Sequence, residues 1–516
     1  MSTFEFILMM LAAAVFLLGL ARRLKLPYPA LLAIAGAALA IAPVDLGLHL
    51  DPELALALFV APVLLDAAYD TSLRDLKRHW VPVASLVLIV VGLTTCAVAW
   101  AVHALVPAIP WAAAIAIGAI VAPPDAVAAT TVMRDVRLPH RVSVILEGEA
   151  LLNDVSALLI YRLAVTAVLA GGGIGAKAIA PTFLLSLFGS VIAGLVLAWA
   201  MGRITRRIED APSSIIVQFV STYGVWLLAQ RSGLSPILTM VSYAMTLARS
   251  TPFYLPARLR IPSYAVWETA VLVLNVLAFL VIGLELGPTI AAAKSGELER
   301  WSVVGAAVLA TVIGVRLLWT VAAALRAGWR IKRGSAAAPG DGPLPSWRTG
   351  IIIGWAGSRG LVTVATALAL PQDFPERSML LFTAFTVTLG TLLIQGLTLR
   401  PLVLALHTRD DAIVQREVRE ARVAMAKAAL VALNGETGGE ADALRAELEA
   451  EHRITGTVDE CDGRPTFPAK ALRAKTLGAR RNRLLTMRTE GVIGDEAFHR
   501  LEEELDFADI AVMRRL

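Results

Sequence analysis

Long apolar runs fill most of the first 406 residues, and few of them show the amphipathic period of soluble helices. A helix needs about 20 apolar residues to cross a bilayer. Thirteen stretches approach that length: residues 4–21, 28–44, 53–69, 80–105, 111–133, 142–169, 181–202, 213–230, 234–249, 263–287, 301–325, 349–371 and 377–406. The pattern therefore predicts an all-α polytopic membrane protein with about 13 transmembrane helices.

Loop charges test this arrangement independently. If the N-terminus lies outside the cell, every second loop, beginning with the first, faces the cytoplasm. These loops hold twenty basic residues, against five in the opposite loops. The positive-inside rule predicts this asymmetry, and a miscounted span would scramble the alternation after it. We therefore expect a multi-pass protein of the cell membrane with its N-terminus outside.

The chain changes character after about residue 407. Arg, Glu and Ala then dominate, with apolar residues at helical spacing. We divide the chain into a transmembrane domain, residues 1–407, and a helical cytoplasmic tail, residues 408–516. The tail is a candidate for regulation or dimerisation, and a solvated helical tail without either role fits the same composition.

Composition narrows the function classes. The 516 residues are 57% hydrophobic and 17% charged, and the net charge of +5 is spread among loops, which indicates topology rather than nucleic-acid binding. Arg22 and Arg23 follow the first run where a signal peptide would have a small-residue cleavage site, so that run is a span. The sequence has no nucleotide loop, nucleophile elbow or metal-spaced Cys/His cluster. We therefore expect neither an enzyme nor a resident cofactor.

Polar residues inside the sixth span are the first candidate site. A charge in hydrocarbon costs several kcal/mol, so an intramembrane carboxylate is a functional candidate by default. Glu149 and Asn153 are four residues apart and share a helix face, while Asp154 lies about 100° from Asn153, so all three can face one crevice. The structural alternative is that these groups only hold the bundle together.

Depth along each span brings in further ionisable groups. At about 1.5 Å per residue, Asp66, Asp125, Asp154 and Arg359 lie roughly 15 to 21 Å into the third, fifth, sixth and twelfth spans. That depth is near the middle of a hydrocarbon core about 30 Å thick. We expect the four groups to converge there, with Glu149 as the counter-ion of Arg359. Asp154 would then stay outside the ion pair, so that a proton and a cation could compete for its carboxylate.

Two spans cannot be regular helices at that depth. The fifth carries Pro123 and Pro124, and the twelfth carries three glycines within residues 354–360. If spans one to six and eight to thirteen are two repeats, the breaks correspond. Broken helices in corresponding positions of two repeats are typical of a transporter's ion site. The alternative is a packing kink in each helix.

These residues match a known family. EGEALLND at 147–154 resembles the Asn-Asp motif of the monovalent cation:proton antiporter-1 family, which includes the NhaP-type bacterial antiporters and the sodium/proton exchangers of animals. The resemblance extends to PYPALLAIAG around 28–36, LFVAPVLLDAAY at 58–69, APPDAVAATTV at 122–132, FLVIGLEL at 279–286 and GWAGSRGLVTVATAL at 354–368.

The resemblance implies a fold and residue roles. The fold would have inverted six-helix repeats with two broken crossing helices, and a homodimer in which a core moves against a dimerisation domain. Asp154 would carry the ion and the proton, and Asn153 would orient it and mark electroneutral exchange. Glu149 and Arg359 would form a structural ion pair, and Asp66 would lie near the ion path.

The chain also departs from the family pattern. Pro124 and Ala150 stand where the family commonly has hydroxyl residues, so Ser156, Thr130 and backbone carbonyls are candidate substitutes. The expected cation ligands are Asp154, Asp125, Asp66, Ser156 and Thr130. The expected function is electroneutral Na⁺/H⁺ antiport by alternating access, serving pH homeostasis. K⁺/H⁺ antiport is the alternative within the family, and a cation channel or a membrane ion or pH sensor is the alternative from another class. Expected partners are the cation, the proton, membrane lipid and a second copy of the chain, with no nucleic acid.

Overall fold

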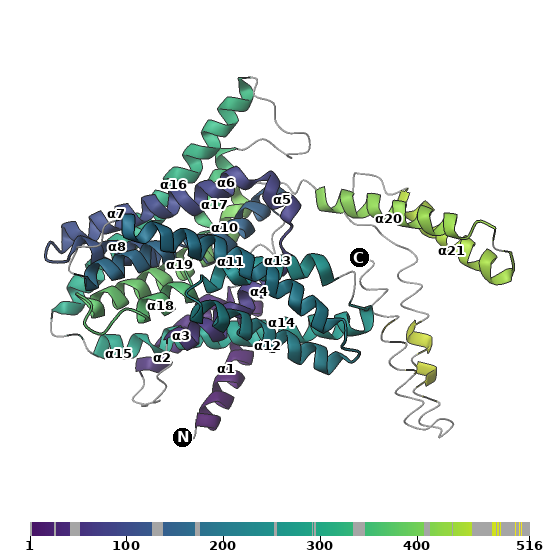
Figure 1. The fold of residues 1–516 in the computed structure, drawn as a ribbon, viewed down its shortest axis with the longest axis horizontal. Helices are drawn as coiled ribbons and strands as arrows, with labels where there is room; N and C mark the ends of the chain where they lie inside the picture. Colours follow the sequence, from purple (N-terminus) through teal and green to yellow (C-terminus); the bar gives the residue numbers. More distant parts are fainter. Residues whose placement is uncertain are drawn as a thin grey trace. The chain divides into compact units, whose positions relative to one another are not determined.

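The computed structural model describes residues 3–24, 27–41, 52–125, 138–170, 176–251, 255–291, 293, 296–333, 346–406, 413–435 and 437–456, with short pieces within 477–507. These residues form helices and no strands (Figure 1). The chain divides into two compact units, Met1–Ala412 and Ile413–Leu516. The all-helical class predicted from the sequence is confirmed for the described residues.

Each of the thirteen predicted spans is helical over at least part of its length. Seven described helices are long and apolar enough to cross a membrane, and three further apolar helices are shorter, so the count of thirteen stays a prediction. The helices of the first unit are α1 (Thr3–Leu24), α2 (Tyr28–Ile41), α3 (Pro52–Ala55), η1 (Leu56–Val60), α4 (Ala61–Asp70), α5 (Leu73–Arg78), α6 (Trp80–Ala84), η2 (Ser85–Val90), α7 (Val91–Leu105), α8 (Trp111–Val121), α10 (His140–Leu169), α11 (Ala176–Thr205), α12 (Ala211–Arg231), α13 (Pro236–Ser250), α14 (Ala257–Leu284), α15 (Leu286–Ala291), α16 (Glu297–Lys332), α17 (Trp347–Trp355), α18 (Leu361–Leu368) and α19 (Arg377–Ala405).

Two buried apolar clusters form the core of this unit. One is built largely from α2, α4, α13 and α14, and the other from α7, α8, α16 and α19. Small residues let the backbones approach closely, as is usual where helices pack inside a membrane. A Cβ on Gly36 would overlap the carbonyl oxygen of Leu280, so α2 and α14 can touch only because that residue is glycine.

The two predicted breaks are present, and they meet. The helix α8 ends at Val121, and the backbone of the following prolines is not helical. Five residues separate α17 from α18. The backbone N–H of Asp125 in the first break donates to the carbonyl of Ser358 in the second, at 2.6 Å. The predicted pair of broken, crossing helices is therefore confirmed. Residues 126–133 of the fifth predicted span lie outside the described residues.

Two helices described in the second unit pack on each other, α20 (Ile413–Ala432) and α21 (Gly439–Gly456). Gly435 and Gly438 lie between them with φ of 93° and 133°, a region that favours glycine. The turn is thus encoded by the glycines that interrupt the helical pattern. The cytoplasmic location and the role of this tail stay predictions.

Candidate functional site: a buried polar network at the crossing

The helix α10 brings the predicted polar residues into the interior. Glu149, Asn153 and Asp154 are 1%, 0% and 6% exposed, although most of their helical neighbours are apolar. Their spacing on one helix places them over about one and a half turns. The prediction that all three face inward is therefore correct.

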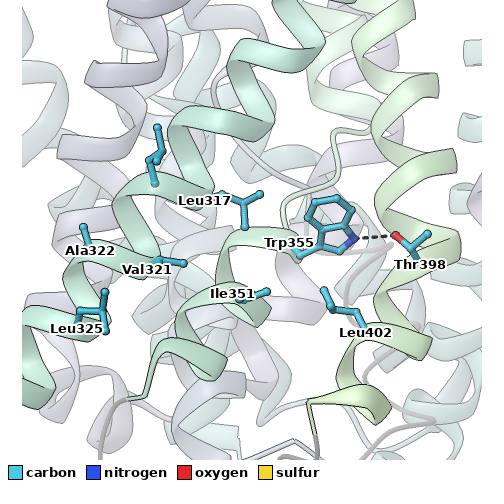
Figure 2. Close-up of a pocket in the computed structure, with 9 residues that line it drawn as sticks. Leu317, Val321, Ala322, Leu325, Ile351, Trp355, Thr398 and Leu402 are labelled. Atoms are coloured by element: carbon cyan, nitrogen blue, oxygen red, sulfur yellow. Dashed lines mark hydrogen bonds between the residues drawn. The ribbon is translucent and has the colours of Figure 1, made fainter.

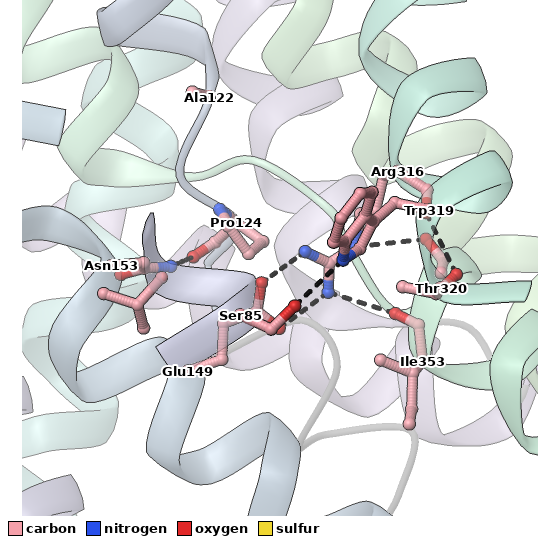
Figure 3. A network of polar contacts seen from close by, with 12 residues as sticks. Ser85, Ala122, Pro124, Glu149, Asn153, Arg316, Trp319, Thr320 and Ile353 are labelled. Carbon is pink, nitrogen blue, oxygen red and sulfur yellow. Dashed lines mark hydrogen bonds and ion pairs between the residues drawn. The ribbon is translucent and has the colours of Figure 1, made fainter. Parts of the chain in front are cut away.

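The ion pair of Glu149 differs from the sequence-based expectation. Its carboxylate binds Arg316 of α16 in a two-pronged contact, in which NH2 donates to Oε2 at 2.8 Å and NH1 donates to Oε1 (Figure 3). Both side chains are almost fully buried. The predicted pair between Glu149 and Arg359 is wrong, because Arg316 occupies both carboxylate oxygens and Arg359 makes no ion pair with any described residue.

Arg359 instead caps the end of α8. Its Nε donates to the carbonyl of Val121 at 2.9 Å, and NH2 donates to that of Ala122 at 3.1 Å. NH1 donates to the carbonyl of Gly357. The last carbonyls of a helix have no intrahelical partner and carry partial negative charge. A buried guanidinium satisfies these carbonyls where water cannot. The carbonyls of the broken helix, and not the carboxylate of Glu149, are therefore the hydrogen-bond partners of Arg359.

Arg316 caps the end of the other broken helix in the same way. Its Nε donates to the carbonyl of Gly354 at 3.2 Å and NH2 donates to that of Ile353 at 3.0 Å, both at the end of α17. A Cβ on Gly357 would overlap the Arg316 side chain, which explains a glycine there. Each of the two half-helices thus ends on a buried arginine, and one of these arginines also neutralises Glu149.

Asn153 ties α10 to the first break. Its Nδ2 donates to the carbonyl of Pro124 at 2.7 Å, an acceptor freed by the non-helical backbone (Figure 3). Its Oδ1 is buried and accepts no hydrogen bond from any described residue. Ser156 donates to the carbonyls of Asn153 at 2.8 Å and of Val87 at 2.7 Å. Val87 belongs to the π-helical stretch η2, which frees carbonyls for such contacts.

Asp154 and Asp125 form the acidic part of the network. Asp154 makes no hydrogen bond or ion pair with any described residue, and it interacts electrostatically with Asp125. Asp125 also lies against the second break, since a Cβ on Gly360 would overlap its Oδ2. Two carboxylates from α10 and the first break therefore repel each other in the interior, and a proton or a cation would relieve that repulsion.

Asp66, another predicted ligand, does not join this acidic pair. Asp66 is half-buried on α4, which packs mainly on α13 and also touches α10. Thr130 lies outside the described residues. In the described part of the chain, no three acidic, histidine or cysteine side chains form a group able to hold a metal ion. Asp66 therefore does not complete a cluster with Asp125 and Asp154.

Neither Arg316 nor Val87 was predicted from the sequence to belong to this network. The signal for Arg316 was its position, sixteenth in an apolar predicted span that carries no other charge. A cation so placed needs a buried partner by the same argument that singled out Arg359. Depth alone does not distinguish two arginines at similar depth.

Discontinuous helices that cross beside buried carboxylates define a class, the ion-coupled membrane transporters. Comparison with known proteins specifies the family. Residues 10–405 match the family model of the transmembrane sodium/hydrogen exchangers, so the chain belongs to that family. It is therefore a multi-pass membrane protein of a family of cation/proton antiporters, which are transporters and not enzymes.

Individual relatives agree with this assignment. An uncharacterized Na⁺/H⁺ exchanger of Mycobacterium tuberculosis is 27% identical, over 98% of this chain and 96% of the relative. A sodium, potassium, lithium and rubidium/H⁺ antiporter of Bacillus subtilis is 29% identical, over 72% of this chain and 57% of that protein. The structure of the sodium proton antiporter MjNhaP1 of Methanocaldococcus jannaschii matches with a TM-score of 0.58 at 17% identity, covering 78% of this chain and 98% of that one. The last likeness shows the antiporter fold.

Proposed function

We propose that this protein exchanges Na⁺ for H⁺ across the cell membrane as an electroneutral secondary antiporter, and so serves pH homeostasis. The observation that carries the proposal is the environment of Asp154. This carboxyl is 6% exposed, lies within the electrostatic reach of Asp125, and has no hydrogen-bond or ion-pair partner among the described residues. A buried carboxylate in that setting is costly until it takes up a proton or a cation.

Competition for Asp154 would couple the two fluxes. The ionised site attracts a cation, and the protonated site is neutral. A site that carries neither leaves an unpaired buried charge, so it is the state least able to reorient across the membrane. Alternating access of the loaded site then gives one cation for one proton. Asn153 holds Asp154 beside the first break through its bond to Pro124.

The cation ligands we propose are oxygens, which hard alkali cations prefer. Asp154 and Asp125 supply charge, and the unpartnered Oδ1 of Asn153 faces no competing donor among the described residues. Ser156, Thr130 and Asp66 remain proposed contributors along the path. Glu149 and Arg316 have the structural role that the sequence assigned to Glu149 and Arg359.

Na⁺ is the first choice of cation because the family model and several relatives carry sodium in their names. K⁺ is the alternative, and the Bacillus subtilis relative is named for sodium, potassium, lithium and rubidium. We further propose a homodimer in the lipid bilayer, with the N-terminus outside and the tail in the cytoplasm. The rival class is a cation channel or ion sensor with the same charges.

The test is pH-dye fluorescence in proteoliposomes with an acid-loaded lumen. NaCl, KCl, LiCl or choline chloride is added outside, with and without a clamp on the membrane potential. Recovery of fluorescence with Na⁺, unaffected by the clamp and absent with choline, is the expected result. Asp154→Asn should abolish it while the protein still elutes as a folded species. Cation-dependent current without proton movement would establish the channel instead.

A further inference from the structure

An apolar cavity lies among α16, α17 and α19. It has a volume of about 580 Å³ and opens between α16, α17 and α19 (Figure 2). Cavities of about 300 to 1,000 Å³ are the usual size for bound organic ligands. Its lining residues are Leu317, Leu318, Val321, Ala322, Leu325, Ile351, Trp355, Thr398 and Leu402.

The walls of this cavity offer no free polar group. The indole N–H of Trp355 donates to Thr398 Oγ1 at 2.8 Å, and these are the polar side-chain groups among the lining residues. Figure 2 shows the bond between α17 and α19, with leucine side chains around it. Leu318 and Leu325 are 74% and 55% exposed on the surface of α16. Walls of this kind suit an aliphatic chain, and the exposed leucines leave the cavity open at the surface of α16.

Two arginines lie one helical turn beyond residues that line the cavity. Arg326 follows the lining residue Ala322 by one turn of α16, and its Nε donates to the Ala322 carbonyl at 3.2 Å. Arg348 precedes the lining residue Ile351 by one turn of α17. Its NH1 donates to the carbonyl of Leu406 at 3.4 Å, just after α19. Both arginines are exposed, and the hydrogen bonds of their side chains to described residues go to backbone carbonyls.

Aromatic rings accompany both arginines. The guanidinium of Arg326 lies 5.1 Å from the ring centre of Trp319, and that of Arg348 lies 5.6 Å from the ring centre of Trp347. Tryptophan with arginine at the end of spanning helices is typical of the membrane interface, where lipid headgroups lie. Basic groups there attract anionic headgroups.

We propose that this cavity is a binding site for one anionic glycerophospholipid. An acyl chain fills the apolar cavity, and the headgroup phosphate binds between Arg326 and Arg348. The proposal rests on the apolar cavity together with these two arginines, and it holds whichever cation the protein carries. The lipid would also brace α16 against α17, the helices from which Arg316 and its two carbonyl acceptors come.

The experiment is native mass spectrometry of the full chain, released from detergent after incubation with phosphatidylglycerol or phosphatidylcholine of equal chain length. The wild type should retain one phosphatidylglycerol in preference to phosphatidylcholine. Arg326→Gln/Arg348→Gln should bind it about 30-fold more weakly, since two basic contacts are lost. Ala322→Trp, which fills the cavity, should lower retention of both lipids. Each variant is first shown to be folded by size exclusion.

Arg203→Gln is the matched control. Arg203 lies 4.2 Å from the ring centre of Trp199, an exposed residue near the end of α11 and apart from the cavity. This variant should retain phosphatidylglycerol as the wild type does. Equal retention of both lipids by the wild type would overturn the anionic specificity. Unchanged retention in both cavity variants, or an equal loss in Arg203→Gln, would overturn the site.

Discussion

Two buried arginines hold the centre of this protein together in different ways. Arg316 joins a carboxylate to the end of α17, whereas Arg359 binds only carbonyls around the two breaks. A guanidinium has five donors in a fixed fork, so it can satisfy a carboxylate and two carbonyls at once. The two residues should therefore respond differently when Glu149 is removed.

We predict that Glu149 is energetically coupled to Arg316 far more than to Arg359. Glu149→Leu and Arg316→Leu should each lower the free energy of unfolding by about 3 to 5 kcal/mol, because each strands a buried charge. The double variant should cost less than the sum, because no charge is left unpaired. SDS-induced unfolding of the purified protein measures both double-mutant cycles. A coupling of Glu149 with Arg359 as large as that with Arg316 would contradict the assigned pair.

The sequence was sufficient to find four buried members of this network, but not to find Arg316 or to pair the charges. Glu149, Asn153, Asp154 and Arg359 are all buried where apolar context predicted. Helix depth follows from residue counting, but the direction in which a side chain leaves its helix depends on how neighbouring helices pack. This direction determines the partner of Glu149, because Arg316 of α16 points toward its carboxylate.

At the scale of elements, the crossing of the two breaks creates the site. Proline removes helical hydrogen bonds locally, so the first break was readable from Pro123 and Pro124. Glycine at the second break has a steric reason, since Gly360 lies directly against Asp125. The π-helical stretch η2 had no comparable signal in its sequence, SLVLIV. Local chemistry thus predicted the breaks, whereas η2 emerged only with packing.

Gly360→Ala should therefore impair transport more than Gly314→Ala. The new Cβ would displace Asp125, and such overpacking costs about 1 to 3 kcal/mol. Gly314 of α16 has open space around it, so alanine there should preserve stability or raise it by up to about 1 kcal/mol. Initial rates in proteoliposomes and melting temperatures compare the two. Normal transport by Gly360→Ala would show that the position of Asp125 does not matter.

The short helix α5, between α4 and α6, should be sensitive to acid. Burial acts to raise the pKa of Asp75, but hydrogen bonds with Arg74 and Ser72 outweigh it, and the pKa lies below its ordinary value. His140, at the start of α10, lies 3.3 Å from the same carboxylate. A lowered pKa means that the carboxylate stabilises the fold at neutral pH and loses this effect as the pH falls through the folded pKa.

Asp75→Asn should thus lower the melting temperature at pH 7. The accompanying loss in the free energy of unfolding should be less than about 1 kcal/mol, because Arg74 is exposed. The difference from the wild type should shrink below about pH 4, where the carboxyl of the unfolded chain is protonated. Asp373→Asn changes an exposed carboxylate between α18 and α19 and serves as the control. A difference that grows on acidification would contradict the assigned sign.

At the scale of the whole molecule, the fold brings Asp154 of α10 close to Asp125 of the first break, which in turn contacts the second break. The apolar pattern predicted the helical class and the broken crossing, and the family model covers residues 10–405. Orientation, dimerisation and the tail's role depend on the bilayer and on partners, so a single chain's sequence constrains them less. The proposed central event, exchange of a proton and a cation on Asp154, depends on the crossing of the two breaks and not on those three features.

The most direct test of that event is the Na⁺ dependence of proton exchange in proteoliposomes at a series of pH values. If both ions compete for Asp154, the apparent KM for Na⁺ rises as the pH falls, while the limiting rate at saturating Na⁺ stays constant. Asp154→Asn shows no exchange at any Na⁺ concentration. A limiting rate that falls with pH at constant KM, or exchange that persists in Asp154→Asn, would contradict the account.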